Sequence, residues 1–434
     1  MEHSLQIGAA EVPITPPLGV SIAGYYEDRK ADDVHDDLYA HAVVLSAGDT
    51  SAAVVVCDLI GLNRDLTLEA REIIEQHTGI PPSRVMVTCT HTHTGPVTSK
   101  RASRIMSADP AYLDVLTRKI ADSVRLAYMR RQPATVEVGR GRAEGMAFNR
   151  RFWMKDGTLR TNPYSQVAEI DRPAGPIDPE VGILLARATD GSPIAVVSNY
   201  ALHADEVGGT AICADYQGVQ ARVLKRVLGE GCVVLCPNGC CGDINHYDVS
   251  KPPPQKGFRV AERSGMVLAG EVIKRLTDLA EAQGSGLFAG SQVLDIPLRV
   301  PTEEEVAWAE KAINGEMHGF DDQGLAVVRA HRILGIRDSG LSQIPVEVSV
   351  ISWGNWAMVG LPGEVFVEHG LRIKEQSPFG HTLVAELCND SIGYVPTQAA
   401  YDQGGYEPNN SRVQPGSGEK MVEVALELLQ RAKG

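Results

Sequence analysis

The run V-M-V-T-C-T-H-T-H-T-G-P, from Val85 to Pro96, places the strongest constraint on how this chain can fold. It has the pattern of a β-strand that ends in two histidines and a Gly-Pro turn. Strand side chains alternate between the two faces of a sheet, so His91 and His93 are expected on the same apolar face as Val85. Neutral imidazole is the commonest protein ligand for zinc, and the end of a strand suits a catalytic cleft. The run therefore predicts a metal site, with two hydrogen-bonded histidines beside a turn as the alternative.

Charge and composition narrow the classes of protein further. The chain has 434 residues, of which 43% are hydrophobic, and can bury a sizeable core. Its formal net charge of −14 argues against nucleic acid or an anionic membrane surface as the main partner. The start Met1–Ser4 lacks the features of a signal peptide, and no stretch approaches the ~18 apolar residues that a membrane span requires. We expect a soluble cytoplasmic protein that acts on a small molecule.

Cysteines crowd into one short segment. Four of the eight lie between Cys232 and Cys241, around a glycine-rich turn. A zinc ribbon would need a second, distant pair, and the adjacent Cys240 and Cys241 are too close for an unstrained disulfide. The spacing favours reduced, packed thiols.

Short apolar runs alternate with amphipathic stretches along the chain, which is typical of an α/β protein. Strands are predicted over Leu5–Ala9, Ala40–Ser46, Ala52–Cys57, Thr135–Gly139, Val181–Ala186, Ile194–Tyr200, Val233–Cys236, Val346–Ser352 and Ala357–Gly360. Helices are predicted over Leu66–Gln76, Ala111–Met129, Gln217–Leu228, Ala261–Ala282, Glu303–Ile313, Val365–Glu375 and Glu419–Ala432. We expect a mixed β-sheet core flanked by helices, with the metal site at a cluster of strand ends.

Three further segments offer polar groups at such ends. His203 follows the strand-like run Ser198–Asp205 and could ligate the same metal or be a structural histidine. The small residues of Asn238–Asp243 could turn backbone N–H groups toward an oxyanion or form an ordinary tight turn. Glu364 follows a buried strand and a Pro-Gly break, where a carboxylate could also cap the helix expected after it.

Motifs in a fixed order span most of the chain. They are G-A-A-E-V-P-I-T-P-P-L-G-V-S-I-A-G-Y (Gly8–Tyr25), H-T-H-T-G-P (His91–Pro96), the pair Asn149-Arg150, I-D-P-E-V (Ile177–Val181), the His203 segment, N-G-C-C-G-D (Asn238–Asp243), L-P-G-E (Leu361–Glu364) and Y-V-P-T-Q-A-A-Y-D-Q-G-G-Y-E (Tyr394–Glu407). Together they resemble the neutral/alkaline ceramidase family of zinc-dependent amide hydrolases.

This resemblance implies one zinc ion per chain. Its ligands would be His91, His203, Glu364 and Tyr394. The resemblance also implies that three more residues line the site and act on the scissile carbonyl or its leaving group, namely His93, Arg150 and Tyr406. Zinc would lower the pKa of a bound water to about 7, Arg150 and Tyr406 would stabilise the oxyanion, and His93 would transfer a proton to the leaving amine. Iron or manganese would also suit histidine and carboxylate ligands.

Departures from the family pattern concern the substrate. The segment Gly242–Tyr247 reads G-D-I-N-H-Y where ceramidases typically have G-D-x-S-P-N, so Asn245 stands at the place of the serine. A nucleophilic role of that serine cannot be transferred, although Asn245 can still hydrogen-bond a carbonyl or a water. His246 is a candidate extra acid/base group or a surface histidine. Y-E-P-N-N, from Tyr406 to Asn410, replaces small residues and should reshape the pocket wall.

These features predict a single catalytic domain over residues 1–434, without the C-terminal β-sandwich domain of secreted ceramidases. We expect a zinc-dependent hydrolase that cleaves an amide of a small soluble substrate, such as an N-acyl or cyclic amide. The alternatives are a zinc esterase or lactonase, a true ceramidase and, least favoured, a non-catalytic binding protein. The chain contains neither G-x-S-x-G nor H-E-x-x-H, which argues against an α/β-hydrolase and a zincin protease.

One segment, Pro301–Leu341, has no counterpart in the family pattern. It is charged and helical in character and includes H-G-F-D-D-Q-G at His318–Gly324. It is a candidate lid or a contact of a homo-oligomer, and the alternative is a solvated helical pair.

Overall fold

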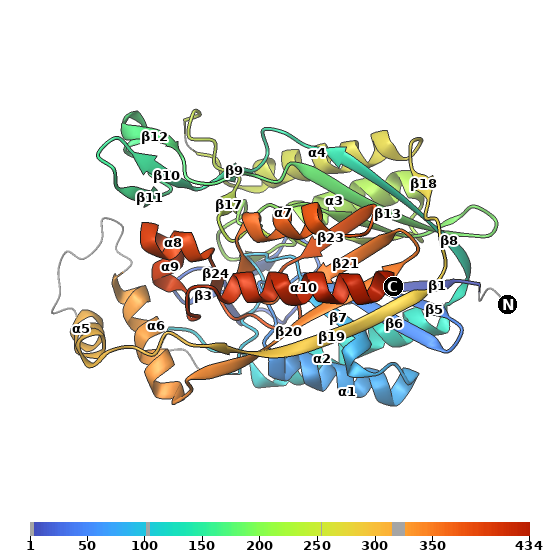
Figure 1. Cartoon of the computed structure of the whole chain (residues 1–434), viewed down its shortest axis with the longest axis horizontal. Coiled ribbons are helices and arrows are strands. Elements are labelled where there is room, and N and C mark those ends of the chain that lie inside the picture. The colour runs from blue at the N-terminus through green and yellow to red at the C-terminus, as the bar shows by residue number, and fades with distance from the viewer. Residues whose placement is uncertain (1–3, 101–104, 253, 315–325) are drawn as a thin grey trace.

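Two β-sheets face each other in the computed structural model, and helices cover the outer face of each (Figure 1). The structure describes the chain except residues 1–3, 101–104, 253 and 315–325. The order of layers is therefore helix, sheet, sheet, helix. This agrees with the predicted α/β class, in which mixed β-sheet lies inside and helices outside.

The longer sheet has the strand order β16-β14-β13-β8-β1-β5-β6-β7, and a short strand, β18, pairs with β8. Its strands are β1 (Gln6–Pro13), β5 (Tyr39–Ala47), β6 (Thr50–Cys57), β7 (Val85–Cys89), β8 (Gln132–Arg142), β13 (Glu180–Ala188), β14 (Pro193–Asn199), β16 (Val233–Leu235) and β18 (Ala280–Glu281). The pairs β6–β7 and β14–β16 are parallel and the other pairs are antiparallel, so the sheet is mixed.

The second sheet has the order β19-β20-β21-β23. Its strands are β19 (Leu287–Pro297), β20 (Gln343–Trp353), β21 (Trp356–Gly360) and β23 (His381–Ala385). Only β20 and β21 were predicted from the sequence. The side chains of β19 are mostly half-buried, which weakens the apolar alternation that identifies a strand.

The period-two pattern explains why both faces of each sheet are buried. In β6, Val54 packs into the core between the two sheets, whereas Val55 packs under the outer helices. In β20, Ile351 belongs to the core between the sheets and Val350 to the core beneath the helices on the other side. Strands such as β6 and β20 therefore read as nearly continuous apolar runs.

The helices are α1 (Arg64–Thr78), α2 (Pro110–Met129), α3 (Asp215–Leu228), α4 (Phe258–Arg275), α5 (Glu303–Ile313), α6 (Ala326–Ser339), α7 (Val367–Gln376), α8 (Gln398–Gln403), α9 (Tyr406–Asn410) and α10 (Ser417–Lys433). Helices α1 and α2 cover one half of the long sheet, and α3 and α4 cover the other half (Figure 1). Helices α7 and α10 cover the second sheet. The described part of the chain includes no helix with the length and apolar character needed to cross a bilayer.

Short strands join the loops at one end of the sheets. They are β2 (Ser21–Ile22), β3 (Arg29–Lys30), β4 (Asp33–Val34), β9 (Phe148–Asn149), β10 (Arg151–Met154), β11 (Leu159–Thr161), β12 (Ile170–Pro173), β15 (Ala211–Ile212), β17 (Ile244–Asn245), β22 (Glu364–Val365) and β24 (Tyr394–Val395). They pair as β2–β3, β4–β15, β9–β17, β11-β10-β12 and β22–β24. These pairs are what bring distant loops to the candidate site.

One predicted helix differs in extent from the structure. The helix predicted over Ala261–Ala282 ends at Arg275, and the chain then returns to the long sheet as β18. The predicted C-terminal end of this helix is wrong because the apolar residues after Arg275 belong to a turn and a strand. In the segment Pro301–Leu341, α5 and α6 pack against each other through Ala309, Ala330 and neighbouring apolar side chains. His318–Gly324 lies outside the described residues.

Candidate metal centre

Three buried histidines converge at one point. The Nε2 atoms of His91 and His203 are 3.0 Å apart, and Nε2 of His93 is 3.4 Å from that of His91. Each side chain is buried, and the ring nitrogens of the three lie within 4.8 Å of one another. The predicted meeting of His203 with the H-T-H-T segment is present.

The loop after β7, and not the strand itself, places His91 and His93. β7 ends at Cys89, and His91 has a φ of +66°. The predicted strand alternation through both histidines is therefore wrong, because a positive φ lies outside the extended region that a β-strand requires. The His91 N–H donates to the carbonyl of Leu59, which holds this turn against the end of β6.

The tautomers of two histidines favour a cation at the point where they meet. The Nδ1 atom of His91 lies 2.7 Å from the Ile60 carbonyl oxygen, and Nδ1 of His203 lies 3.3 Å from the Cys241 carbonyl oxygen. Because a carbonyl only accepts, each Nδ1 carries the proton and each Nε2 presents a lone pair. Burial lowers the pKa of His203 well below its ordinary value, so the ring is neutral. Two lone pairs 3.0 Å apart repel each other unless a cation lies between them, so the residues fit a metal ion.

Glu364 adds a carboxylate to this point. Its Oε2 atom is 3.6 Å from Nε2 of His91 and 4.0 Å from Nε2 of His203. Glu364 lies in β22, and α7 begins three residues later, at Val367. The alternative in which Glu364 caps the following helix is therefore wrong, since its side chain turns toward the histidines.

Tyr394 lies beside Glu364 because β22 and β24 pair in parallel with these two residues in register. The glycines before them make the pairing possible. Gly363 and Gly393 both have φ near +80°, and a Cβ atom on Gly363 would lie 2.6 Å from the Gly393 carbonyl oxygen. Tyr394 is buried, and burial together with Glu364 raises its pKa well above the ordinary value.

Arg150 and Tyr406 both lie beside Tyr394. The Arg150 guanidinium carbon is 5.5 Å from the centroid of the Tyr394 ring, and the two tyrosine rings are also 5.5 Å apart. Arg150 donates from Nε to Glu407 at 2.7 Å and from Nη2 to the Gly242 carbonyl at 2.7 Å. These bonds fix the plane of the guanidinium in a buried position.

Asp205 is a neighbour of the cluster that the sequence analysis did not single out. Its Oδ1 atom is 3.6 Å from Nδ1 of His93 and accepts hydrogen bonds from Lys256 Nζ at 2.8 Å and from the Tyr25 hydroxyl. Burial alone would raise the pKa of Asp205, but His93 and Lys256 hold it below the ordinary value. The available signal was the spacing H-A-D, which puts this carboxylate two residues after His203.

Asn245 and His246 are less directly connected with the cluster. Asn245 donates to the side chain of Asn162 at 2.7 Å, and His246 is bonded through Nε2 to the Gln255 carbonyl at 2.7 Å. Burial lowers the pKa of His246 to about 4. The hydrogen bonds of these two side chains thus run to neighbouring loops and not to the three histidines.

A buried acid supports two of the loops. Glu386 accepts from the Cys241 N–H at 3.0 Å and from the Val365 N–H at 2.9 Å, and the Cys241 thiol donates to it at 2.9 Å. Burial raises the pKa of Glu386 to about 8. The Glu386 carboxyl group therefore links Cys241, whose carbonyl bonds His203, to Val365, the residue after Glu364. The cysteines are free and buried, as the spacing predicted.

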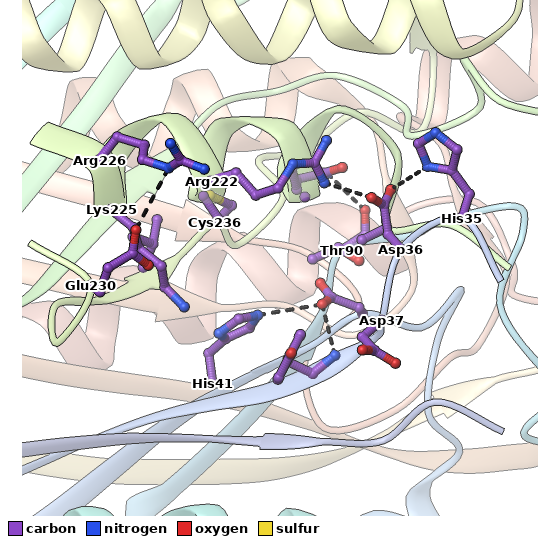
Figure 2. Close-up of a pocket in the computed structure, with 17 residues that line it drawn as sticks. His35, Asp36, Asp37, His41, Thr90, Arg222, Lys225, Arg226, Glu230 and Cys236 are labelled. Atoms are coloured by element: carbon purple, nitrogen blue, oxygen red, sulfur yellow. Dashed lines mark hydrogen bonds and ion pairs between the residues drawn. The ribbon is translucent and has the colours of Figure 1, made fainter.

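A cavity of about 390 Å³ adjoins the histidine loop (Figure 2). Thr90, His41, Asp58 and Cys236 line it, together with charged side chains of α3. The three histidines are not part of its wall. It is therefore a hollow beside the loop, separate from the point where the three histidines meet.

The model of the neutral/alkaline non-lysosomal ceramidase family, N-terminal part, matches residues 5–231, just over half of the chain. The chain belongs to this family. The fold is similar to that of the neutral ceramidase from Pseudomonas aeruginosa, with 18% identity and a TM-score of 0.76 over 99% of this chain and 75% of that one. A ceramidase complexed with C2 is similar at 16% identity and a TM-score of 0.74, over 99% of this chain and 76% of that one. Membership of the family makes this protein a hydrolase that acts on amide bonds.

Proposed function

We propose that this ceramidase-family protein is a zinc-dependent amide hydrolase whose zinc ion is held by His91, His203, Glu364 and Tyr394. The convergence of imidazole nitrogens on the Glu364 carboxylate carries the proposal. Nitrogen and oxygen donors of this kind suit zinc. When bound, the ion would lower the pKa of water and polarise an amide carbonyl.

The other residues of the site would handle charge and protons. With Nε and Nη2 of Arg150 committed to Glu407 and Gly242, the remaining donors of the guanidinium would serve a substrate oxygen. The Tyr406 hydroxyl, which is bonded to that of Tyr26, would add a neutral donor there. Placed near charge that develops in the transition state, such donors accelerate acyl transfer.

His93 would return a proton to the leaving amine. Asp205 faces its Nδ1 atom, so the proton would rest on that nitrogen and Nε2 would work toward the substrate. Burial lowers the pKa of His93 to about 3, which keeps the ring neutral until it takes up a proton in the reaction.

The walls around the cluster favour a small polar amide. Tyrosine hydroxyls and charged groups gather there and are engaged with one another, namely Tyr25, Tyr26, Arg150, Asp205, Lys256 and Tyr406. Long alkyl chains gain binding energy from apolar surface, which these groups do not supply. A short N-acyl or cyclic amide matches them better.

Substrate profiling tests the proposal. Zinc-loaded protein is assayed with a series of short N-acyl amides, with the matching esters, and with ceramide in detergent. We expect turnover of the short amides that is lost on chelation and restored by zinc. Turnover confined to ceramide would contradict the substrate, and amide turnover unaffected by chelation would contradict the mechanism.

A further inference from the structure

The geometry points to a second metal site, built by His35, Asp36 and Cys213, which would take zinc or another thiolate-binding divalent ion. The Cys213 Sγ atom is 3.0 Å from Oδ2 of Asp36 and 4.0 Å from Nδ1 of His35, and that Nδ1 is 3.2 Å from the same Oδ2. Ligand atoms around tetrahedral zinc are about 3.3–3.6 Å apart, given bonds of about 2.0–2.3 Å. The three donors therefore need shifts of only a few tenths of an ångström.

The fold brings these residues together from opposite parts of the chain. β4 and β15 pair in parallel, and the backbone N–H groups of His35 and Asp36 both donate to the Ile212 carbonyl, at 2.8 and 3.2 Å. Cys213 follows directly. The site thus lies where two short strands end, on backbone that is already hydrogen-bonded.

Surrounding groups orient each donor, as they do in established metal sites. The His35 ring stacks on Phe258 with centroids 4.0 Å apart. Asp36 accepts at Oδ1 from Arg222 at 2.6 Å (Figure 2), which leaves Oδ2 for the contact with Cys213. The Asp215 N–H donates to Cys213 Sγ at 3.3 Å, a bond that stabilises a thiolate.

His35 is the exposed member of the three donors. Cys213 is buried, whereas 42% of the His35 side chain is exposed, so an ion can enter past the imidazole and keep a water as a fourth ligand. On binding, the Cys213 thiol would give its proton to solvent, and the sulfur electron pair would form the new bond to the ion. The divalent ion would neutralise the two negative charges of Asp36 and the thiolate, and Arg222, bonded to Asp36, would add one further positive charge beside them.

A metal ion bound at this second site would rigidify the loop that carries His91 and His93. The Cys213 carbonyl accepts from the hydroxyls of Thr92 at 2.7 Å and Thr94 at 3.0 Å, and its N–H donates to the Thr94 carbonyl at 3.3 Å. Thr92 lies between His91 and His93. A metal that immobilises Cys213 would therefore hold both histidines in place without touching substrate.

Cobalt substitution tests this site separately from the histidine cluster, which contains no sulfur donor. Protein stripped by a chelator is titrated with Co²⁺, and bound cobalt and near-ultraviolet absorption are followed together. We expect a second cobalt ion per chain and a sulfur-to-cobalt charge-transfer band. His203→Ala should lose the ion of the histidine cluster and keep the band, while Cys213→Ser should lose the band and one ion.

Two further variants serve as controls for this experiment. Cys236→Ser removes another buried thiol, from the wall of the neighbouring cavity, and should keep the band. His35→Ala alters a side chain that is 42% exposed, so this variant should fold even if Cys213→Ser does not, and it should weaken binding of the second cobalt ion at least about tenfold. Absence of the band in the parent, or its persistence in Cys213→Ser, would overturn the proposal.

Discussion

The Nε2 atoms of His91 and His203 face each other at 3.0 Å, although 112 positions separate the two residues in the chain. Both side chains are buried, and each has its other ring nitrogen bonded to a carbonyl. With both Nδ1 atoms directed at carbonyl oxygens, the two Nε2 atoms are placed to bind one cation. Binding of a cation at this point would therefore add to the stability of the fold as well as to its chemistry.

The metal content of the protein should depend on the residues of the histidine cluster. Elemental analysis of the parent is expected to find zinc, and His203→Ala and Glu364→Ala should each lose about one ion per chain. Chelation should lower the free energy of unfolding by about 3 kcal/mol, the amount that a ligand at 100 times its Kd contributes. His246→Ala is the control, since the hydrogen bond of that side chain runs to Gln255. Retention of the ion in both cluster variants would refute the site.

Substitution of His93 should lower the rate of catalysis without removing the metal ion. In His93→Gln we expect zinc to remain, held by the four proposed ligands, while kcat falls by about 10²–10⁴-fold for loss of a general acid. KM should change little. Metal content and steady-state rates of the same preparation check this. Loss of the ion in this variant would show that His93, 3.4 Å from His91, is itself a ligand.

Arg150 should contribute to catalysis through the forked geometry of its guanidinium group. Arg150→Lys keeps the positive charge but cannot bond Glu407 and Gly242 while also reaching a substrate oxygen. We expect kcat to fall by about 10²-fold or more, as on removal of an oxyanion donor. Arg151→Lys is the matched control, because Arg151 also lies near Glu407, at 3.6 Å, and bonds the Gly404 carbonyl. Equal losses in kcat for the two variants would argue against this role.

His41 should make stability depend on pH. Burial would lower its pKa, but Asp58 and Glu11 raise it to about 9, above the unfolded value of about 6.5. The folded protein therefore binds this proton more tightly. The resulting stabilisation, up to about 3 kcal/mol, is fully present below pH ~6.5 and is lost as pH rises through about 9.

Denaturant unfolding between pH 6 and pH 9.5 measures this effect. The parent should lose stability over that range more steeply than His41→Gln does. His77→Gln, which alters an exposed histidine of α1, should keep the slope of the parent. Parallel curves for the parent and His41→Gln would show that the buried His41 does not carry the proton.

Local pattern located most of the strands and helices. The predicted helices over Leu66–Gln76 and Ala111–Met129 lie within α1 and α2, because an apolar stripe of helical period is a property of a single segment. Strands with weak patterns were missed. β23 and the half-buried β19 owe their structure to pairing with β20 and β21, which no local window reports.

The identities of the proposed metal ligands came from the resemblance to a family, and that resemblance rested on the order of the motifs along the chain. Spacing alone would not have joined Glu364 and Tyr394 to the histidines, because their positions depend on the β22–β24 pairing and on two glycines with positive φ. Asp205 was missed since its role requires three partners from separate loops, Tyr25, His93 and Lys256.

The sequence by itself determined the α/β class, the buried strands, the reduced cysteines and the types of residue available for a metal site, because these follow from local periodicity and side-chain chemistry. The tertiary structure alone decided which groups meet. β7 and β14 are not neighbours in the sheet, and the loops after them come together only when the whole sheet and its covering helices have packed. A ligand set from distant segments is a property of that packing, which no stretch of the chain encodes separately.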